Sequence, residues 1–323
     1  MSRHPIPLFI VGSGRSGTTV TAALLNRFPR VHIAKETGYI GLEIEQLRHV
    51  DDPAVVQRLL AVVNQWLSKE QWDVQATEQG FREFCNRYQL AGGRAFINYI
   101  WQLDSPVPWH ELEYIGDNTP LYVMAIPAIL EFMPESRFIH MMRDPRDLVC
   151  SILKMRFGAD DLVTAALEWH IYVGCWLMAE RLLAAEHRIE CRYEDLCTNT
   201  EQALGKLADF LGRDRSEAAA ALAAHATGLS TDPRFQKVAT LQHHTRLSEP
   251  LNAGRIARYR KELSAEQIRI IEEIAQYGMK AYGYQPTQWH THPLMREDRM
   301  YLLKAMIRDM ARRFYKRMLR RSA

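Results

Sequence analysis

The sequence is poor in cysteine and has no long apolar run. Its 323 residues include five cysteines, none of them in a C-x-x-C pair, so neither a disulfide framework nor a zinc site is indicated. No stretch approaches the roughly 18 uninterrupted apolar residues of a membrane span, and the N-terminus does not resemble a signal peptide. A cytoplasmic protein is therefore expected.

A large excess of charge of one sign is also missing from the chain as a whole. Lys and Arg number 41 against 38 Asp and Glu, with 47% hydrophobic residues, a composition that excludes disorder, collagen and coiled coil. No nucleic-acid partner is predicted. The charge is nevertheless unevenly distributed. Residues 294–323 contain ten Lys and Arg and three acids, a net charge of +7. The net charge of residues 1–293 is therefore −4.

Residues 294–323 have the pattern of a basic amphipathic helix. The apolar stripe comprises Leu303, Ile307, Met310, Phe314 and Met318, and the basic stripe comprises Lys304, Arg308, Arg312, Lys316 and Arg320. Such a helix can attach the protein peripherally to an anionic membrane surface, or it can pack on its own domain or on a partner. Both interpretations stay open, as does the oligomeric state.

Residues 8–34 have the pattern of a β-α-β unit. Leu8–Val11 is an apolar run typical of a buried strand, Gly12–Gly17 interrupts it, and the apolar residues of Val20–Phe28 follow helical spacing. A second β-like run follows at Val31–Ala34. This order predicts an α/β fold with a central parallel sheet flanked by helices, whose carboxyl edge carries the glycine loop. Open α/β sheets bind ligands at that edge.

Strands and helices alternate along the rest of the chain. The expected strands are Tyr114–Gly116, Arg137–Met142 and Ile189–Tyr193, and the expected helices include Tyr122–Phe132, Asp147–Lys154 and Leu162–Glu186. The stretch of about 41–112 is mostly helical, and most of its many aromatic residues are expected in the core. We expect a single domain over 1–293 with this stretch as a helical insertion, followed by the helix at 294–323.

The glycine loop matches two nucleotide-binding patterns incompletely. Gly12, Gly14 and Gly17 fit the dinucleotide fingerprint, and Glu36 lies about where a ribose-binding acid would be. Gly12 and Gly17 also have the separation found in a nucleoside triphosphate P-loop, but Thr18 replaces the lysine that reaches the β- and γ-phosphates.

A third interpretation of the loop is a phosphosulfate site. Backbone N–H groups and the start of the helix would hold an anion, Arg15 adds a fixed cation, and Ser16, Thr18 and Thr19 supply hydroxyl donors. These donors exceed what capping a helix requires, so we favour this interpretation.

A second anion site is predicted after the strand Arg137–Met142. Arg143 ends this strand, and Ser151 follows eight residues later in the next helix, so the two side chains can converge on one dianionic phosphate. A kinase that transfers a γ-phosphate would not require this pair. A nucleotide-binding kinase-like or regulatory P-loop protein is nevertheless the alternative function.

The two motifs together resemble those of the PAPS-dependent sulfotransferase family, whose members use 3′-phosphoadenosine-5′-phosphosulfate (PAPS). The resemblance implies that Gly14-Arg15-Ser16-Gly17-Thr18-Thr19 is the 5′-phosphosulfate loop and that Arg143 with Ser151 binds the 3′-phosphate. It also implies the bacterial-type, P-loop-like three-layer architecture with helical insertions, the released product 3′,5′-adenosine bisphosphate, and no required metal.

Two later segments extend the resemblance. Cys191-Arg192-Tyr193-Glu194-Asp195-Leu196 is similar to a family strand whose tyrosine lies near the adenine. Gly254, Arg255 and Arg258 belong to a segment similar to the one that closes over the nucleotide. The alternatives are a buried strand tyrosine and a solvated basic face.

The resemblance also implies a mechanism. A sulfuryl group passes in line to a hydroxyl or amine of a small-molecule, lipid or carbohydrate acceptor, while Arg15 and the loop N–H groups stabilise the leaving oxygen. Glu36 follows the second strand at the same sheet edge and looks like the family's catalytic base, although an acid at a helix N-terminus is the alternative. The family also includes histidine bases, and the weaker candidates here are His110, His140, His243 and His244.

One position departs from the family pattern. Asn118 stands before Thr119-Pro120, where members often carry a lysine at the active site. A second catalytic cation is therefore not predicted.

Overall fold

The computed structural model describes residues 4–41, 43–69, 72, 74–155, 159, 161–226, 251 and 253–287. The predicted helix at 294–323 and the candidate bases His243 and His244 lie outside these residues. The chain divides into two compact units, and each is described by itself. The first comprises Met1–Met142 and Cys175–Ala253, and the second comprises Arg143–Gly174 and Gly254–Ala323.

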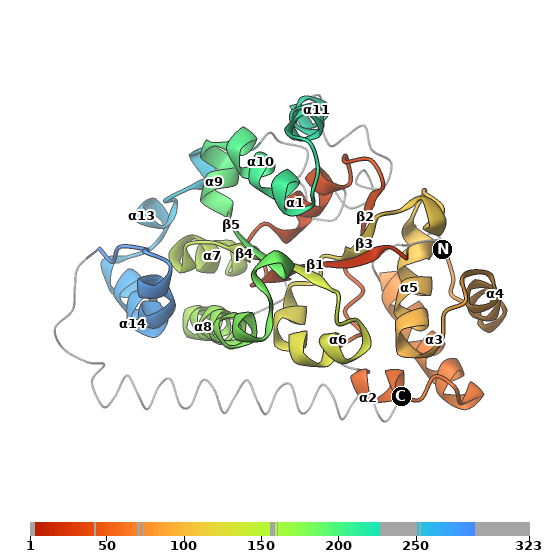
Figure 1. Cartoon of the computed structure of the whole chain (residues 1–323). Helices are drawn as coiled ribbons and strands as arrows, with labels where there is room; N and C mark the ends of the chain where they lie inside the picture. The colour runs from red at the N-terminus through yellow and green to blue at the C-terminus, as the bar shows by residue number, and fades with distance from the viewer. Residues whose placement is uncertain are drawn as a thin grey trace. The chain divides into compact units, whose positions relative to one another are not determined.

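The first unit is built on a parallel sheet of five strands (Figure 1). The strands are β1 (Ile6–Gly12), β2 (Val31–Ala34), β3 (Tyr114–Asp117), β4 (Arg137–Met142) and β5 (Arg188–Arg192). Their order is β2-β3-β1-β4-β5, and every neighbouring pair is parallel. The α/β fold with a central parallel sheet is therefore confirmed.

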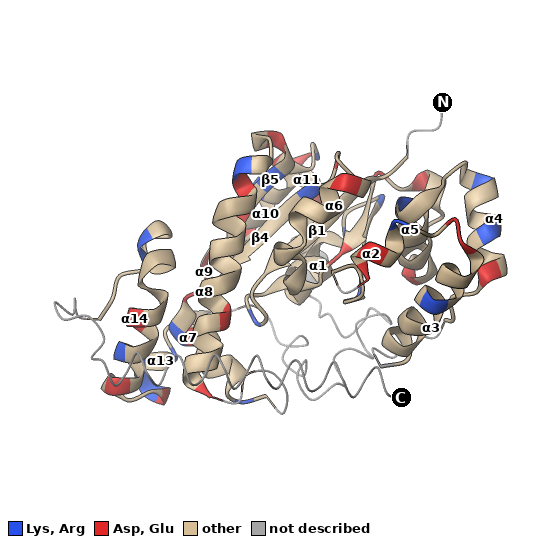
Figure 2. Ribbon diagram, turned by 90° about the horizontal axis from the view of Figure 1, so that it is seen from below, with Lys and Arg blue, Asp and Glu red and all other residues tan. Residues whose placement is uncertain are grey.

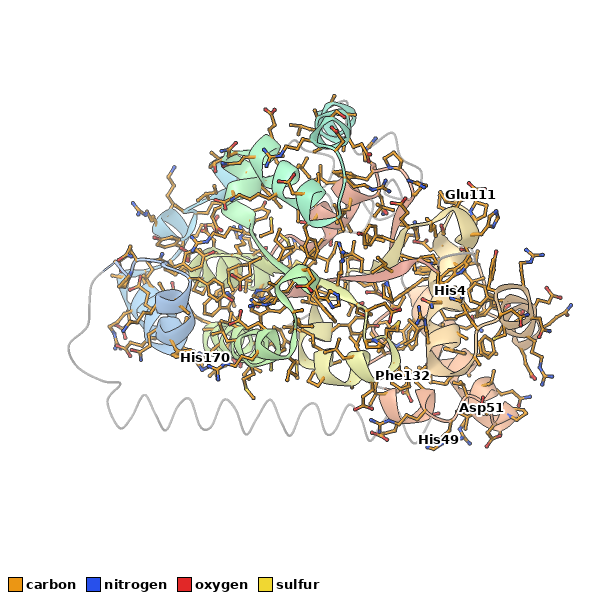
Figure 3. All side chains as sticks on the ribbon, viewed as in Figure 1. His4, His49, Asp51, Glu111, Phe132 and His170 are labelled. Carbon is orange, nitrogen blue, oxygen red and sulfur yellow. The ribbon has the colours of Figure 1, made fainter. Side chains whose placement is uncertain are left out.

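Helices cover both faces of this sheet. In Figure 1, α1 (Thr18–Leu25) and α10 (Thr200–Phe210) lie on one face and α6 (Ile126–Phe132) lies on the other. Side chains fill the space between the sheet and its helices, as Figure 3 shows. At the centre, the ring of Phe9 stacks on Phe138 at 5.3 Å and meets Trp101 edge-on at 5.3 Å.

The close approach of β3 to β1 depends on one glycine. A Cβ atom at Gly116 would overlap the carbonyl oxygen of Leu8 on β1. Because no other residue lacks a Cβ atom, only glycine allows these two strands to pair in this register.

The stretch between β2 and β3 is mostly helical. It contains α2 (Ile44–Leu47), α3 (Pro53–Lys69), α4 (Glu78–Tyr88) and α5 (Gly92–Asp104). Its aromatic rings pack on one another, with Phe81 against Phe96 and Phe84 against Trp109, both at 5.3 Å. Figure 2 shows both signs of charge side by side on α4, where Arg82 pairs with Glu78 at 2.6 Å.

The second unit is helical in its described residues. It contains α7 (Pro145–Ile152), the part of α8 (Leu162–Ala179) up to Gly174, α13 (Tyr259–Glu262) and α14 (Ala265–Ala281). Gly278 of α14 packs directly on α8, since a Cβ atom there would lie 2.8 Å from the ring of Trp169. The guanidinium of Arg146 is buried between Asp144 and Glu272, at 2.6 and 2.7 Å.

One helical stretch is notably apolar. By length and composition alone, Leu162–Leu182 could cross a membrane, with a mean hydropathy of 1.3, but half of this window is buried. The core helix of a folded protein passes the same test, and Trp169 in this stretch is 1% exposed.

Candidate active site

The predicted phosphosulfate loop connects β1 to α1 at the carboxyl edge of the sheet. Within the sheet, β2 lies to one side of β1, and β4 lies to the other side. The loop therefore lies at the point where the strand order reverses, which is where open α/β sheets bind their ligands.

Left-handed backbone conformations shape the loop. Gly12, Arg15 and Gly17 have φ angles of 145°, 70° and 105°, and the amide of Ser16 donates to the carbonyl of Ser13 at 3.2 Å. Turns that contain left-handed residues bring successive N–H groups into a concave surface, and such surfaces bind anions.

Several donors of the loop are available to an anion. No side chain caps α1 at Gly17, and the first turn of α1 contains no acidic residue. The hydroxyl of Ser16 is fully buried and has no hydrogen-bond partner among the described residues. Beside Gly14 there is open space, since no atom lies within 4 Å of where its Cβ would be. The loop thus fits a phosphate or sulfate group, which carries only acceptor oxygens.

Tyr193 packs against this loop. A Cβ atom at Gly17 would lie 2.7 Å from Cδ2 of Tyr193, so the tyrosine ring directly touches the glycine. The predicted strand ends one residue earlier, at Arg192, and Tyr193 is the first residue of α9 (Tyr193–Thr198). The two family motifs, 176 residues apart in sequence, therefore meet in the first unit.

Glu36 lies at the same edge of the sheet, just after β2. Its side chain is half-buried. Strand β3 lies between β2 and β1. The end of β2, which Glu36 follows, is therefore two strand spacings, about 10 Å, from the end of β1, which the loop follows.

Sequence reasoning missed a buried polar cluster next to Glu36. Asp117, the last residue of β3, accepts hydrogen bonds from the hydroxyl and amide of Thr37 and, at 2.5 Å, from the amide of Thr119. Burial raises the pKa of Asp117 to about 6, although these hydrogen bonds lower it. An acid that ends a strand at the edge carrying Glu36 was the signal available in the sequence.

In the second unit, Arg143 contacts the segment that contains Arg255. The side chain of Arg143 is buried, its Nη2 donates to the carbonyl of Arg255 at 3.2 Å, and its own carbonyl accepts from Nε1 of Trp169 at 3.0 Å. Asp147 of α7 accepts from the amides of Ala257 and Tyr259, at 2.6 and 3.0 Å. The segment that begins at Arg143 and the segment that contains Arg255 are therefore joined by hydrogen bonds. Both were assigned to the nucleotide by the family resemblance.

The remaining predicted residues of the second unit have different environments. Ser151 is half-buried on α7. Gly254 is exposed in the 3-10 turn Ala253–Arg255. Arg258 pairs with Glu262 four residues later, so its charge is compensated locally. A role for these three residues in binding phosphate stays a prediction.

Comparison with known proteins identifies the family of this chain. A model of the sulfotransferase family matches residues 7–217, more than half of the chain. This chain belongs to the sulfotransferase family.

Two animal enzymes are distant relatives of this family member. It is 21% identical to protein-tyrosine sulfotransferase of Drosophila melanogaster over 285 residues, which are 86% of this chain and 52% of the relative. It is 22% identical to protein-tyrosine sulfotransferase 2 of Gallus gallus over 313 residues, 92% of this chain and 76% of that one. The chain spans about half the length of the fly relative.

Two solved sulfotransferase domains have a similar fold. The domain of the Synechococcus PCC 7002 olefin synthase is 19% identical, with a TM-score of 0.55 over 88% of this chain and 98% of the domain. The domain from the curacin biosynthetic pathway is 17% identical, with a TM-score of 0.52 over 88% and 99%. The predicted sulfotransferase architecture is therefore confirmed.

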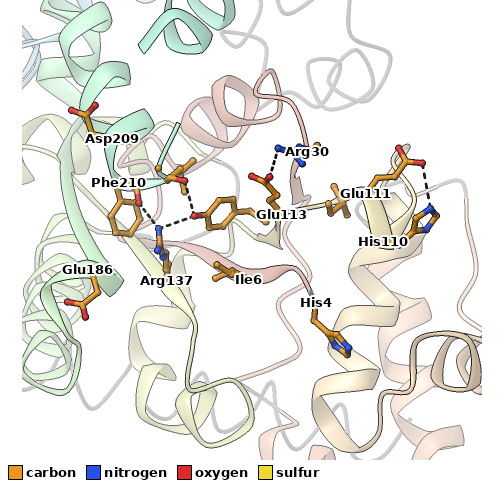
Figure 4. Close-up of a pocket in the computed structure, with 14 residues that line it drawn as sticks. His4, Ile6, Arg30, His110, Glu111, Glu113, Arg137, Glu186, Asp209 and Phe210 are labelled. Atoms are coloured by element: carbon orange, nitrogen blue, oxygen red, sulfur yellow. Dashed lines mark hydrogen bonds and ion pairs between the residues drawn. The ribbon is translucent and has the colours of Figure 1, made fainter. Parts of the chain in front are cut away.

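Within this sulfotransferase fold, the two described histidine candidates are poorly placed to act as the base. His110 precedes β3, at the amino edge of the sheet, and lines an open pocket of about 940 Å3 with His4 and Glu111 (Figure 4). The loop, Glu36 and Tyr193 do not line this pocket. His140 of β4 is 1% exposed and stacks on Trp176, and burial lowers its pKa to about 3, so it is a core residue.

Asn118, which directly follows β3, has a buried side chain. Its Oδ1 atom has no hydrogen-bond partner among the described residues. Among these residues there is also no group of three or more His, Cys, Asp or Glu side chains that could hold a metal ion.

Proposed function

We propose that this chain transfers a sulfuryl group from PAPS to a hydroxyl or amine of a small-molecule, lipid or carbohydrate acceptor. The observation that carries the proposal is the set of open donors in the β1–α1 loop, above all the buried hydroxyl of Ser16, at the sheet edge that carries Glu36. The family resemblance assigns the 5′-phosphosulfate to residues 14–19, the adenine to Tyr193 and the 3′-phosphate to Arg143 and Ser151.

The loop would act on the leaving group. In the reaction, the acceptor atom bonds to sulfur while the bond from sulfur to the bridging phosphate oxygen breaks, and negative charge builds on that oxygen. Fixed donors aimed at such charge lower the barrier, and this is the role that we give to Arg15 and the N–H groups of the loop. The product is 3′,5′-adenosine bisphosphate.

Glu36 would receive the proton that the acceptor loses. A carboxylate that is within hydrogen-bond reach of the attacking hydroxyl or amine can act as a general base. The position of Glu36 supports this role, because the residue is half-buried and directly follows β2 at the carboxyl edge of the sheet.

The test is a transfer assay with labelled PAPS and the full chain. Acceptors would include phenols, fatty alcohols, sugars, a cell extract and a tyrosine-containing peptide, the last because two relatives are named protein-tyrosine sulfotransferases. Glu36→Gln should lose turnover and still bind 3′,5′-adenosine bisphosphate in calorimetry. Glu83→Gln, on the exposed side of α4, is the matched control.

Two results would count against the proposal. Tight binding of ATP with magnesium, without any binding of 3′,5′-adenosine bisphosphate, would favour the kinase-like alternative. Full turnover by the Glu36 variant would move the base to another residue.

A separate proposal concerns residues 294–323. We propose that their net charge of +7 attaches the enzyme to an anionic membrane on its cytoplasmic side. The full chain should co-sediment with vesicles of phosphatidylserine but not of phosphatidylcholine, and a chain that ends at residue 293 should not. Equal sedimentation of both chains would reject attachment through this segment.

A further inference from the structure

We propose that Asp117 is a positioning residue of the transfer reaction, whose buried carboxylate fixes the backbone that carries Glu36. The inference rests on the proposed function, in which Glu36 takes the proton of the acceptor. Asp117 itself is buried at the end of β3, and both of its carboxylate oxygens accept hydrogen bonds from protein groups, so it acts through its neighbours.

The residue that follows Glu36 is held by Asp117. Oδ2 of Asp117 accepts from the amide of Thr37 at 3.2 Å and also from the Thr37 hydroxyl. Oδ1 accepts from the amide of Thr119 at 2.5 Å. One carboxylate therefore joins the segment after β2 to the turn after β3.

Neighbours of Asp117 reinforce the same connection. Oγ1 of Thr119 accepts from the amides of Thr37 and Gly38, at 3.1 and 3.3 Å. The hydroxyl of Tyr122 lies 2.8 Å from the Thr37 hydroxyl and accepts from the amide of Ile40 at 3.3 Å. The backbone after Glu36 is thus hydrogen-bonded to side chains from the region that follows β3.

The residue before Glu36 is held in the same manner. The amide of Lys35 donates to Oδ2 of Asp104, the last residue of α5, at 3.3 Å. Nε2 of the buried His32 lies 3.5 Å from that Asp104 oxygen. Both neighbours of Glu36 therefore donate their amides to carboxylates, that of the buried Asp117 and that of Asp104, whose side chain is 10% exposed. This restricts the direction in which the Glu36 side chain leaves the backbone.

A carboxylate suits this position better than an amide. Both donors of Thr37 converge on one oxygen of Asp117. In an asparagine side chain the second oxygen becomes an NH2 group, which donates and cannot accept. Asp117→Asn should therefore release one of the two connections while keeping the size of the side chain.

Kinetics of single and double variants test the inference. A base that is displaced by about 1 Å can lose about 100-fold in rate, so we expect Asp117→Asn to lower kcat by about that factor. The KM for PAPS and the affinity for 3′,5′-adenosine bisphosphate should stay within twofold, because the loop is untouched. In the Glu36→Gln background, Asp117→Asn should cost nothing further, since its effect passes through Glu36.

Thr37 supplies a second test if the Asp117 variant fails to fold. Thr37→Ser keeps the hydroxyl and should retain turnover, whereas Thr37→Val removes it and should lower kcat without raising the KM for PAPS. Equal turnover by the two Thr37 variants would overturn the inference, and so would an equal loss from Asp117→Asn with and without Glu36.

The outcomes also separate this inference from the proposed function. If the wild-type chain transfers sulfate, Glu36→Gln abolishes transfer and Asp117→Asn retains it, the inference is wrong and the proposed function stands. If the wild-type chain neither transfers sulfate nor binds 3′,5′-adenosine bisphosphate, the proposed function fails and the inference fails with it.

Discussion

The state of the Asp117 carboxyl group can be tested without any assay of activity. Burial raises its pKa from the usual 3.8 to about 6, against the lowering effect of its hydrogen bonds. The folded protein therefore binds this proton more tightly than the unfolded chain does. Its contribution to stability is fully present below about pH 4 and is lost as the pH rises to about 6.

The size of the effect follows from the pKa difference. At about 1.4 kcal/mol per pKa unit, a rise from 3.8 to about 6 corresponds to about 3 kcal/mol. Asp117→Asn removes the titrating group. The free energy of unfolding of the wild type, relative to that of the variant, should therefore fall by about 3 kcal/mol between pH 3 and pH 8.

Urea unfolding of both proteins at several pH values measures this difference. Because every other ionisable group is shared, the comparison isolates Asp117. Asp51→Asn, at the exposed position labelled in Figure 3, is the matched control. A wild-type minus variant difference that is constant, or that rises with pH, would show that the buried carboxyl does not resist ionisation, and would refute the reasoning.

Three further substitutions test individual contacts. Gly14→Ala should leave the Tm unchanged, because the new Cβ meets open space. It should weaken the binding of 3′,5′-adenosine bisphosphate about tenfold or more in calorimetry. Unchanged affinity would contradict the proposed site. Gly278→Ala should destabilise the chain by about 1–3 kcal/mol in urea, since the new Cβ lies 2.8 Å from the ring of Trp169, and a neutral effect would show that the helices can separate. Glu272→Ala should cost about 3 kcal/mol because it leaves the buried Arg146 with fewer acceptors, and a stable variant would contradict that burial.

The strands were predictable because parallel strands are buried on both faces and read as short apolar runs. Val31–Ala34 and Arg137–Met142 have the predicted bounds. Helix ends were less predictable. The helix expected to reach Glu186 ends at Ala179, and the chain becomes extended at Leu183, with φ −104° and ψ 131°. Apolar spacing continues past such a break, so it does not reveal where the backbone leaves the helix.

The expected helix Tyr122–Phe132 also has an interruption. The structure has a 3-10 turn at Pro120–Met124 and a separate α6 from Ile126, with Ala125 outside the helical region at φ −105° and ψ 3°. Pro127 lies in the first turn of α6, where its missing N–H costs nothing. A proline in the middle of the expected helix was the signal for this boundary.

The loop could be predicted and the hydrogen-bond partners of Asp117 could not, for a physical reason. A glycine loop between a strand and a helix is local, so spacing alone identifies it. The partners of Asp117 come from separate segments, and Thr37 is 80 residues away in sequence. Only the pairing of β2 with β3 brings the two ends together.

Two buried polar atoms at the carboxyl edge of the sheet bear on function. At the amino edge, Arg137 donates to the Tyr114 hydroxyl and to the Phe210 carbonyl, as Figure 4 shows. At the carboxyl edge, the Ser16 hydroxyl and Oδ1 of Asn118 are buried without partners among the described residues. A buried polar atom without a partner costs about 1–3 kcal/mol, and such atoms persist where a ligand satisfies them. The hydroxyl can donate to a sulfate or phosphate oxygen and the amide oxygen can accept from a hydroxyl or amine, which are the groups that the two substrates of the proposed reaction bring.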